Sequence, residues 1–186
     1  MSIRLGILGI GSMGRHHVRN ARATAGVDLV ALADPGGDRF GVAGDLPVLG
    51  GVEELIEAGI DAAIIAAPTA HHEAAALALA EAGVHTLVEK PLATSVEAGA
   101  RIRDAFAAAG LVGAVGYVER CNPALIDMRR RIADGQLGAI EQIATRRQSP
   151  FPARISDVGV VKDLATHDVD LAAWVAGAPY ESIYAR

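Results

Sequence analysis

The chain has 186 residues, of which 51% are hydrophobic and 4% aromatic, and its formal net charge is −5. This length suits one domain, alone or with a small second one, and the composition is typical of helices packed closely on a parallel sheet, which excludes a disordered chain. The negative charge, without any basic tract, argues against a nucleic-acid-binding surface, so we expect no nucleic-acid partner.

A short apolar run opens the chain and ends in a glycine-rich loop, Gly9-Ile10-Gly11-Ser12-Met13-Gly14, which enters a helical pattern over Ser12–Ala23. In such a strand–loop–helix turn, Gly9 permits the tight turn, Gly11 leaves room for a pyrophosphate, and Gly14 lets helix and strand pack closely. The N–H groups at the helix start would hold the phosphates. The pattern predicts a dinucleotide site; the alternative is a βα turn that needs glycine only for packing.

Strand and helix patterns alternate through the first part of the chain. After the opening strand, further strands are predicted at Val27–Ala33, Ala62–Ala66, His85–Val88 and Leu111–Tyr117. Helices are predicted between them at Val52–Ala58, Ala70–Ala82 and Ser95–Ala109. This alternation indicates an α/β fold with a doubly wound parallel sheet, a Rossmann domain that we assign to residues 1–118.

Residues 119–186 change in character and are predicted to start an incomplete α+β domain for substrate binding and oligomerisation. The predicted elements are helices at Pro123–Ala133 and Asp163–Ala176, a half-exposed strand at Ile140–Arg147, a loop-rich stretch at Ser149–Val161 and the start of a strand at Ser182–Tyr184. In the first of these helices, Arg129, Arg130 and Arg131 are expected to form a solvated face. In the second, Leu164, Leu171 and Trp174 are expected to face inward.

The only cysteine, Cys121, can form no internal disulfide, which fits a reducing compartment, and we interpret it as a buried thiol rather than a nucleophile. The chain enters its first strand without a signal-peptide pattern, and no apolar run approaches the ~20 residues of a membrane span. We therefore expect a soluble cytoplasmic protein with no membrane partner.

Ligands of open α/β sheets bind beyond the carboxyl ends of the strands, where three polar clusters of this sequence fall. The first is Asp34, about 20 positions beyond the glycine loop, where a carboxylate would bind ribose hydroxyls and repel a 2′-phosphate. This favours NAD, although the nearby Arg39 keeps NADP as the alternative. The second is Pro68-Thr69 with His71 and His72, for which a ligand role and a cap or surface role are equally open.

The third cluster is Glu89-Lys90-Pro91, which follows a buried strand. Two opposite charges at such a place are costly unless they are paired, so the cluster indicates either a functional site or a structural Glu–Lys ion pair at the sheet rim. A lysine that loses solvent beside a positively charged nicotinamide is a usable proton donor or acceptor. A cis bond before Pro91 is one way to aim Lys90.

A fourth candidate lies on the helix predicted to start at Asp163. Asp163 and His167 are spaced i, i+4, so their side chains would share one helix face. A carboxylate that holds an imidazole in one tautomer makes it a better general base. This pair is therefore a candidate acid–base catalyst.

Metal binding is not expected. His167, Asp168 and Asp170 are poorly matched in spacing to a metal site, and the two aspartates are equally able to cap the helix or pair with arginines. His16 and His17 are adjacent, cannot share a helix face, and are interpreted as surface or boundary residues.

With these pieces in order, the chain resembles the glucose–fructose oxidoreductase / inositol dehydrogenase (Gfo/Idh/MocA) family. The motifs are the glycine loop, Pro68-Thr69-Ala70-His71-His72, the run from Ala82-Gly83-Val84-His85 into Glu89-Lys90-Pro91, and Asp163…His167-Asp168. The resemblance covers nearly the whole chain and implies an NAD(P)-dependent oxidoreductase acting on a sugar or cyclic polyol hydroxyl. It implies that Lys90 is the catalytic lysine, Asp163 the carboxylate partner and His167 the acid/base.

The resemblance also implies how the cofactor is held. Glu89 and His72 would line the nicotinamide-ribose side, and Thr69 the cofactor rim. With the glycine loop and Asp34, the implied cofactor-binding residues are Gly9, Gly11, Ser12, Met13, Gly14, Asp34, Thr69, His72, Glu89 and Lys90.

A narrower similarity lies in Glu119–Ala124 and Ser149–Val160, which look like the branch that oxidises the 3-hydroxyl of UDP-N-acetylglucosamine or its uronic acid. Cys121 stands where that branch usually has an aromatic residue. A nucleotide-sugar substrate would need basic or amide groups, and the candidates are Arg120, Asn122, Arg147 and Arg154, together with His167. The alternatives are an inositol or other polyol dehydrogenase and a catalytically idle NAD-binding module.

Members of this family continue through an open sheet that covers the substrate and forms much of the oligomer contact, and this sequence stops as that sheet begins. It is therefore either a fragment or a shortened protein, and the full-length form is expected to be a homo-oligomer. An unfinished sheet would expose backbone hydrogen-bonding groups at its edge.

Overall fold

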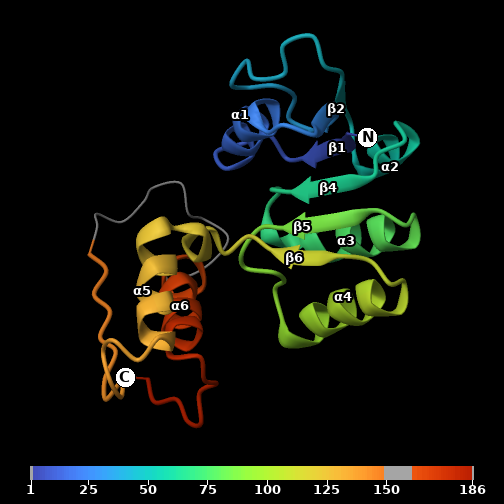
Figure 1. The fold of residues 1–186 in the computed structure, drawn as a ribbon. Helices are drawn as coiled ribbons and strands as arrows, with labels where there is room; N and C mark the ends of the chain where they lie inside the picture. The colour runs from blue at the N-terminus through green and yellow to red at the C-terminus, as the bar shows by residue number, and fades with distance from the viewer. Residues whose placement is uncertain (1, 149–160, 186) are drawn as a thin grey trace. The chain divides into compact units, whose positions relative to one another are not determined.

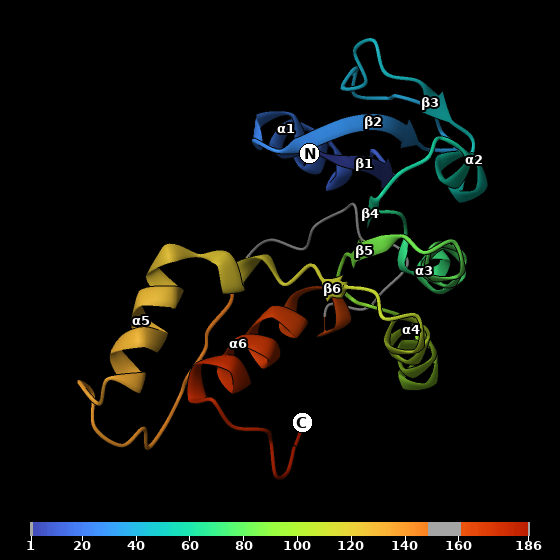
Figure 2. The ribbon, with the colours of Figure 1, turned by 45° about the vertical axis from the view of Figure 1, so that its right-hand side comes forward.

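Six strands form one parallel sheet in the order β3-β2-β1-β4-β5-β6. Figure 1 shows this order from β2 to β6, and Figure 2 shows β3 next to β2. The computed structural model describes residues 2–148 and 161–185. The strands are β1 (Ile3–Leu8), β2 (Val27–Ala33), β3 (Val48–Leu49), β4 (Ala62–Ile65), β5 (His85–Val88) and β6 (Gly113–Val115). Every neighbouring pair is parallel, which confirms the predicted doubly wound Rossmann fold. The chain divides into two units, Met1–Gly116, which holds this sheet, and Tyr117–Arg186.

Helices cover both faces of the sheet. They are α1 (Gly14–Ala23), α2 (Val52–Glu57), α3 (His72–Glu81), which follows the 3₁₀ turn η1 (Thr69–His71), and α4 (Val96–Ala108). Figure 2 shows α2, α3 and α4 along one face and α1 on the other. Leu5 and Ile7 of β1 belong to the hydrophobic cluster that includes Val18 of α1, whereas Leu8 belongs to the cluster that includes Leu79 of α3. Because strand side chains alternate between faces, β1 is buried on both sides, which explains its apolar run.

The predicted elements of the first unit form with small changes at their ends. The first helix begins at Gly14 instead of Ser12, and the strand predicted at Leu111–Tyr117 shortens to β6. The strand β3 was not predicted, because two residues are too few to leave a pattern in the sequence. None of the described helices is long and apolar enough to cross a membrane.

Two helices dominate the second unit. Its described elements are the 3₁₀ turn η2 (Val118–Cys121), α5 (Pro123–Ala133), the π-helical turn η3 (Val161–Ala165) and α6 (Thr166–Ala176). The side chain of Asn122 caps α5 by accepting a hydrogen bond from the Ala124 N–H, at 3.1 Å. The guanidinium of Arg129 lies over the ring of Trp174, 4.5 Å from its centroid, so this arginine links α5 to α6. Arg129, Arg130 and Arg131 are all exposed, as expected of a solvated face.

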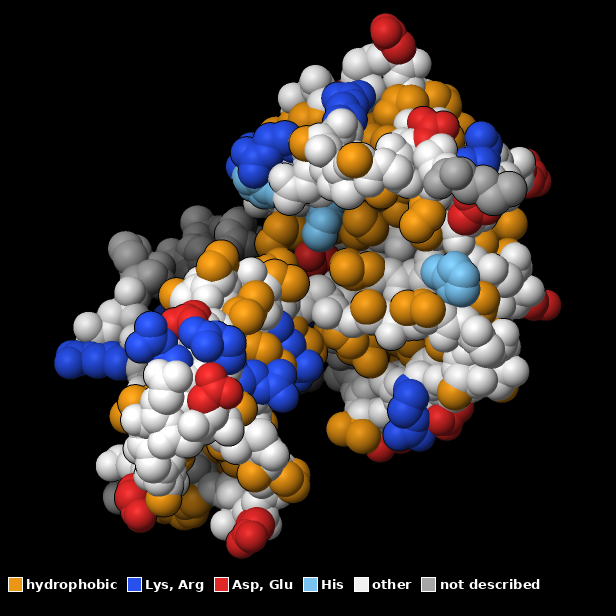
Figure 3. All heavy atoms as spheres, in the orientation of Figure 1, with side chains coloured by type: hydrophobic (Ala, Val, Ile, Leu, Met, Phe, Trp, Pro, Cys, Tyr) orange, Lys and Arg blue, Asp and Glu red, His pale blue; other side chains and the backbone are white. Residues whose placement is uncertain are grey.

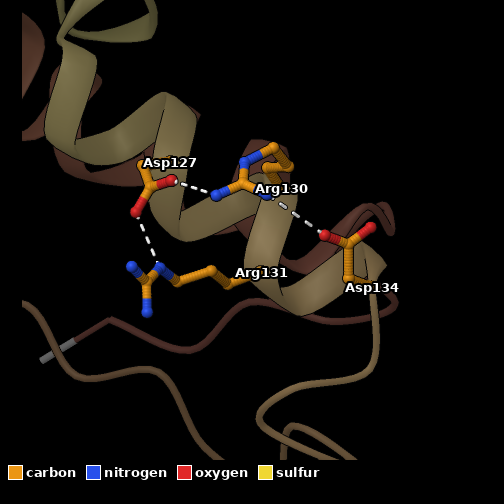
Figure 4. Close-up of polar contacts among 4 residues, drawn as sticks. All are labelled: Asp127, Arg130, Arg131 and Asp134. Atoms are coloured by element: carbon orange, nitrogen blue, oxygen red, sulfur yellow. Dashed lines mark hydrogen bonds and ion pairs between the residues drawn. The ribbon is translucent and has the colours of Figure 1, made fainter.

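The other two arginines of α5 form ion pairs on the helix surface. Arg130 bonds to Asp127 at 2.6 Å and to Asp134 at 3.4 Å, and Arg131 bonds to Asp127 at 2.7 Å (Figure 4). These partners lie three or four residues away, the spacing at which helical side chains meet. Figure 3 accordingly shows basic and acidic side chains interspersed over α5.

Three predictions for the second unit are wrong in the described residues. The stretch predicted as a strand at Ile140–Arg147 is exposed and has no regular structure, and Ser182–Tyr184 forms no strand either. A strand is stabilised by hydrogen bonds to a neighbouring strand, and the described part of residues 117–186 contains no strand to pair with. Cys121, predicted to be buried, is exposed at the end of η2. The predicted loop at Ser149–Val161 lies almost entirely outside the described residues.

Candidate active site

The glycine loop joins β1 to α1 through a very close backbone contact. A Cβ at Gly14 would lie 1.9 Å from the carbonyl oxygen of Gly9, so only glycine lets α1 begin where it does. Gly9 has a φ of +86°, and a Cβ there would lie 2.6 Å from the Ala67 nitrogen. A Cβ at Gly11 would meet no atom within 4 Å, which leaves open space beside the loop.

The start of α1 is suited to an anion. Met13, its N-cap residue, makes no side-chain capping hydrogen bond, and the first turn contains no acidic residue. The first N–H groups of a helix have no intrahelical partner and carry a partial positive charge, so phosphates bind at such a helix start. The loop and the helix start thus have the geometry of a dinucleotide-binding turn.

Asp34 lies directly after β2 and holds the glycine loop. Its Oδ2 accepts a hydrogen bond from the Ile10 N–H at 3.0 Å, and its Oδ1 accepts one from the Gly36 N–H at 2.8 Å. An ionised carboxylate has about four acceptor positions, so two backbone bonds leave capacity for hydroxyl donors. The side chain therefore lies beside the loop with the chemistry needed for a ribose.

Arg39 packs against the turn that follows Asp34. A Cβ built at Gly36 would lie 2.5 Å from the Arg39 Nη2, which means that the guanidinium covers this glycine. Nearby in sequence, the guanidinium of Arg15 lies over the ring of Phe40, 4.8 Å from its centroid. The guanidinium of Arg39, the group that keeps NADP as the alternative cofactor, thus lies beside the turn that follows Asp34.

His72 does not have the accessible position expected of a residue that lines a nicotinamide ribose. It is 1% exposed, its Nε2 lies 2.8 Å from the Ala67 carbonyl oxygen and its Nδ1 lies 3.0 Å from the Pro91 carbonyl oxygen. Both ring nitrogens thus face backbone carbonyls, so the ring ties the end of β4 to the segment after Lys90. Thr69 is also buried, at 8% exposure, whereas His71 is exposed.

The Glu89-Lys90-Pro91 segment leaves β5 at the same edge of the sheet. Glu89 is buried, Lys90 is half-buried, and the Lys90–Pro91 peptide bond is cis. The Oε1 of Glu89 lies 2.7 Å from the Nε2 of His17, and its Oε2 accepts a hydrogen bond from the Lys90 N–H at 3.2 Å. The structure thus pairs the buried carboxylate with an imidazole of α1.

The pairing of His17 with Glu89 was not predicted from the sequence, because His16 and His17 were interpreted together as surface or boundary residues. The buried residues of α1 are Gly14, Val18 and Ala21, a stripe at helical spacing. His17 lies three residues after Gly14 and four before Ala21, on the same stripe, while His16 is exposed. Helical spacing could therefore have separated the two.

The predicted substrate residues of the second unit are engaged with neighbours in that unit. Arg120 donates two hydrogen bonds to Asp170, at 2.8 and 2.5 Å, and these bonds raise its pKa above the usual range. Arg147 pairs in the same way with Asp168 at 2.9 Å, which also raises the arginine's pKa. Asp168 and Asp170 thus pair with arginines, as one of their two expected roles required. The other predicted substrate residue, Arg154, lies outside the described residues.

The predicted helix over Asp163–Ala176 is not uniformly α-helical. Asp163 lies in the π-helical turn η3, and His167, which is half-buried, lies in the first turn of α6. A π-helix bonds i to i+5, so the i, i+4 spacing does not by itself place these two side chains on one face. The side chain of Asp163 lies outside the description.

Comparison with known proteins identifies the family. Residues 3–117 match the family described as "Oxidoreductase family, NAD-binding Rossmann fold", and residues 125–186 match the Gfo/Idh/MocA C-terminal domain. The chain therefore belongs to the Gfo/Idh/MocA oxidoreductase family, as its motifs indicated.

Two of its relatives are named for different substrates, a cyclic polyol and a nucleotide sugar. The chain is 33% identical to scyllo-inositol 2-dehydrogenase (NAD(+)) of Bacillus subtilis, an alignment that covers 97% of this chain and 56% of the relative. It is 32% identical to UDP-N-acetylglucosamine 3-dehydrogenase of Acidithiobacillus ferrooxidans, over 95% and 55% of the two chains. A solved structure of the latter enzyme matches with a TM-score of 0.82 and 30% identity, over 95% of this chain and 57% of that one. The chain thus spans little more than half the length of these relatives.

Proposed function

We propose that the protein is an NAD-dependent oxidoreductase that transfers a hydride between a secondary hydroxyl carbon of a sugar, nucleotide sugar or cyclic polyol and the nicotinamide. The observation that carries the proposal is the arrangement of three features at the carboxyl edge of one sheet. The glycine loop follows β1, Asp34 follows β2 and Lys90 follows Glu89 at the end of β5. Ligands of open α/β sheets bind along this edge.

The cofactor site has a distinct task for each group. The N–H groups of the loop directly before α1 bind the pyrophosphate at the positive end of the helix dipole, with Gly11 leaving the space that it needs. Asp34 accepts hydrogen bonds from the ribose hydroxyls while it keeps its bonds to the loop. The bound nicotinamide supplies the hydride acceptor.

Oxidation of an alcohol to a ketone also requires that the hydroxyl proton leaves. Lys90 or His167 takes this proton, and Asp163 is the carboxylate partner; these assignments rest on the family motifs Glu89-Lys90-Pro91 and Asp163…His167-Asp168. Positioned acid–base groups of this kind contribute about 10²–10⁴ to a rate.

The substrate is a small molecule with a secondary hydroxyl, and the relatives supply the two classes to test. A panel of scyllo-inositol, myo-inositol and UDP-N-acetylglucosamine separates a cyclic polyol from a nucleotide sugar. We propose the 3-hydroxyl of a UDP-N-acetylhexosamine as the finer candidate, because the chain resembles that branch in Glu119–Ala124. The identities of 33% to the inositol enzyme and 32% to the UDP-N-acetylglucosamine enzyme do not distinguish the two classes.

The cofactor preference is expected to follow the charge of Asp34. Calorimetric titration should give tighter binding of NADH than of NADPH, because the carboxylate repels a 2′-phosphate. In Asp34→Asn the charge is lost, and a hydrogen bond to a charged group is worth about 1.5–3 kcal/mol. The NADH affinity should therefore fall by roughly 10–100-fold, and the preference over NADPH should narrow.

The matched control is Asp28→Asn, which removes an exposed carboxylate from the same strand. It should leave both affinities unchanged. Equal binding of NADH and NADPH by the unmodified chain would contradict the role of Asp34, and absence of binding to either would contradict the proposed function.

A further inference from the structure

The buried carboxylate of Glu89 is held by a histidine that belongs to the cofactor-binding helix. The side chains of Glu89 and His17 are 7% and 16% exposed, and Oε1 and Nε2 lie 2.7 Å apart. An ionised carboxylate only accepts hydrogen bonds, so Nε2 is the donor. This contact joins the first turns of α1 to the end of β5.

Gly116 confines the same carboxylate. A Cβ at Gly116 would lie 2.9 Å from the carboxyl carbon of Glu89 and 3.0 Å from each of its oxygens. The Gly116 N–H donates to the Val88 carbonyl oxygen at 2.7 Å, which fixes this glycine beside β5. The φ of Gly116 is not positive, so its backbone accepts other residues and only the space beside Glu89 excludes a side chain.

The confined carboxylate also touches the next residue. Its Oε2 accepts the hydrogen bond of the Lys90 N–H at 3.2 Å. One carboxylate thus links the imidazole of α1, which follows the glycine loop by a single turn, to the backbone of Lys90.

We propose that His17 is a positioning residue that, through Glu89, fixes Lys90 relative to the cofactor-binding helix. This inference rests on the proposed function, because it takes Lys90 to be the catalytic residue. A displacement of about 1 Å in a catalytic group can cost about 10²-fold in rate, so His17→Ala should lower kcat by roughly that factor. The NADH affinity should change far less, because His17 does not form the phosphate or ribose contacts.

Substitutions on two sides of the carboxylate test the proposal. In His17→Gln the side-chain amide can donate from nearly the position of Nε2, so most of kcat should return. In Gly116→Ala the new methyl group displaces the carboxylate end of Glu89, which should lower kcat and, because a buried hydrogen bond is disturbed, also lower the melting temperature modestly. His16→Ala, on the same helix but exposed, is the matched control and should behave as the unmodified chain.

A second readout requires no turnover. Lys90 and Lys162 are the only lysines in the sequence, so reductive methylation with isotope-labelled formaldehyde places an NMR-visible group on few sites. Lys162→Arg identifies the Lys90 signal. The chemical shift of this signal should be the same in the unmodified chain, His16→Ala and His17→Gln. It should differ in His17→Ala and Gly116→Ala.

The two proposals fail in different ways. If the unmodified chain neither binds NADH nor turns over any substrate, the proposed function is wrong, yet the Lys90 signal still reports whether His17 positions this residue. If the Lys90 signal of His17→Ala coincides with that of the unmodified chain, or if His17→Gln is as impaired as His17→Ala, the positioning role is wrong. A folded Gly116→Ala variant with an unmoved signal would also overturn it.

Discussion

Replacing Lys90 with alanine should abolish turnover while the dinucleotide still binds. The phosphates and ribose depend on the glycine loop, the start of α1 and Asp34, none of which this substitution changes. Loss of a positioned proton-transfer group costs about 10²–10⁴ in rate. Initial rates followed by NADH absorbance, with the substrate panel above, measure the first effect, and calorimetric titration with NADH measures the second.

Arg103→Ala is the matched control for Lys90→Ala. It removes a cation from α4 whose side chain is 71% exposed, and it should retain the full rate. A Lys90→Ala chain that keeps most of its turnover would refute the catalytic role. A chain that loses NADH binding along with turnover would instead place Lys90 in cofactor binding.

The second large effect is expected at Gly14. In Gly14→Ala the Cβ would lie 1.9 Å from the carbonyl oxygen of Gly9 and 2.8 Å from its carbonyl carbon. Both are backbone atoms that cannot rotate away, so α1 must move off the loop. Overpacking costs about 1–3 kcal/mol and occasionally more, and a backbone clash belongs at the upper end of that range. Urea unfolding followed by circular dichroism should show this loss, together with loss of NADH binding.

Gly11→Ala should separate folding from cofactor binding. A Cβ at Gly11 would meet nothing within 4 Å and its φ is not positive, so the stability should equal that of the unmodified chain. The methyl group would occupy the space that a pyrophosphate needs, so NADH affinity should nevertheless fall. A fully stable Gly14→Ala chain would contradict the packing role of Gly14, and normal NADH binding by Gly11→Ala would contradict the proposed phosphate position.

The parallel sheet could be predicted from the sequence because its strands are buried on both faces. Short apolar runs such as Val27–Ala33 and His85–Val88 have few alternatives, and they form β2 and β5 with the predicted bounds. Ile140–Arg147 carried a weaker signal, alternation alone. Alternation indicates which side chains would face water, but it does not show that a neighbouring strand is available for pairing. No strand forms over these residues.

The candidate site was only partly predictable. Motif spacing located the glycine loop, Asp34 and the Glu89-Lys90-Pro91 segment, because their chemistry depends on local order in the chain. The partner of Glu89 lies 72 positions earlier, at His17, and the carbonyl partners of His72 include Pro91, 19 positions later. Such pairs depend on which helix face meets the sheet and on the course of the chain after β5, which local patterns do not specify.

Because of the contact between Arg129 and Trp174, tryptophan fluorescence reports on the packing of the second unit. Trp174 is the only tryptophan of the chain, and its ring packs under the guanidinium of a neighbouring helix. Separation of α5 from α6 would expose more of the indole to water and shift its emission to the red. A denaturation experiment that records tryptophan emission and far-ultraviolet circular dichroism in parallel would therefore reveal whether the two units unfold together or one before the other, without any added label.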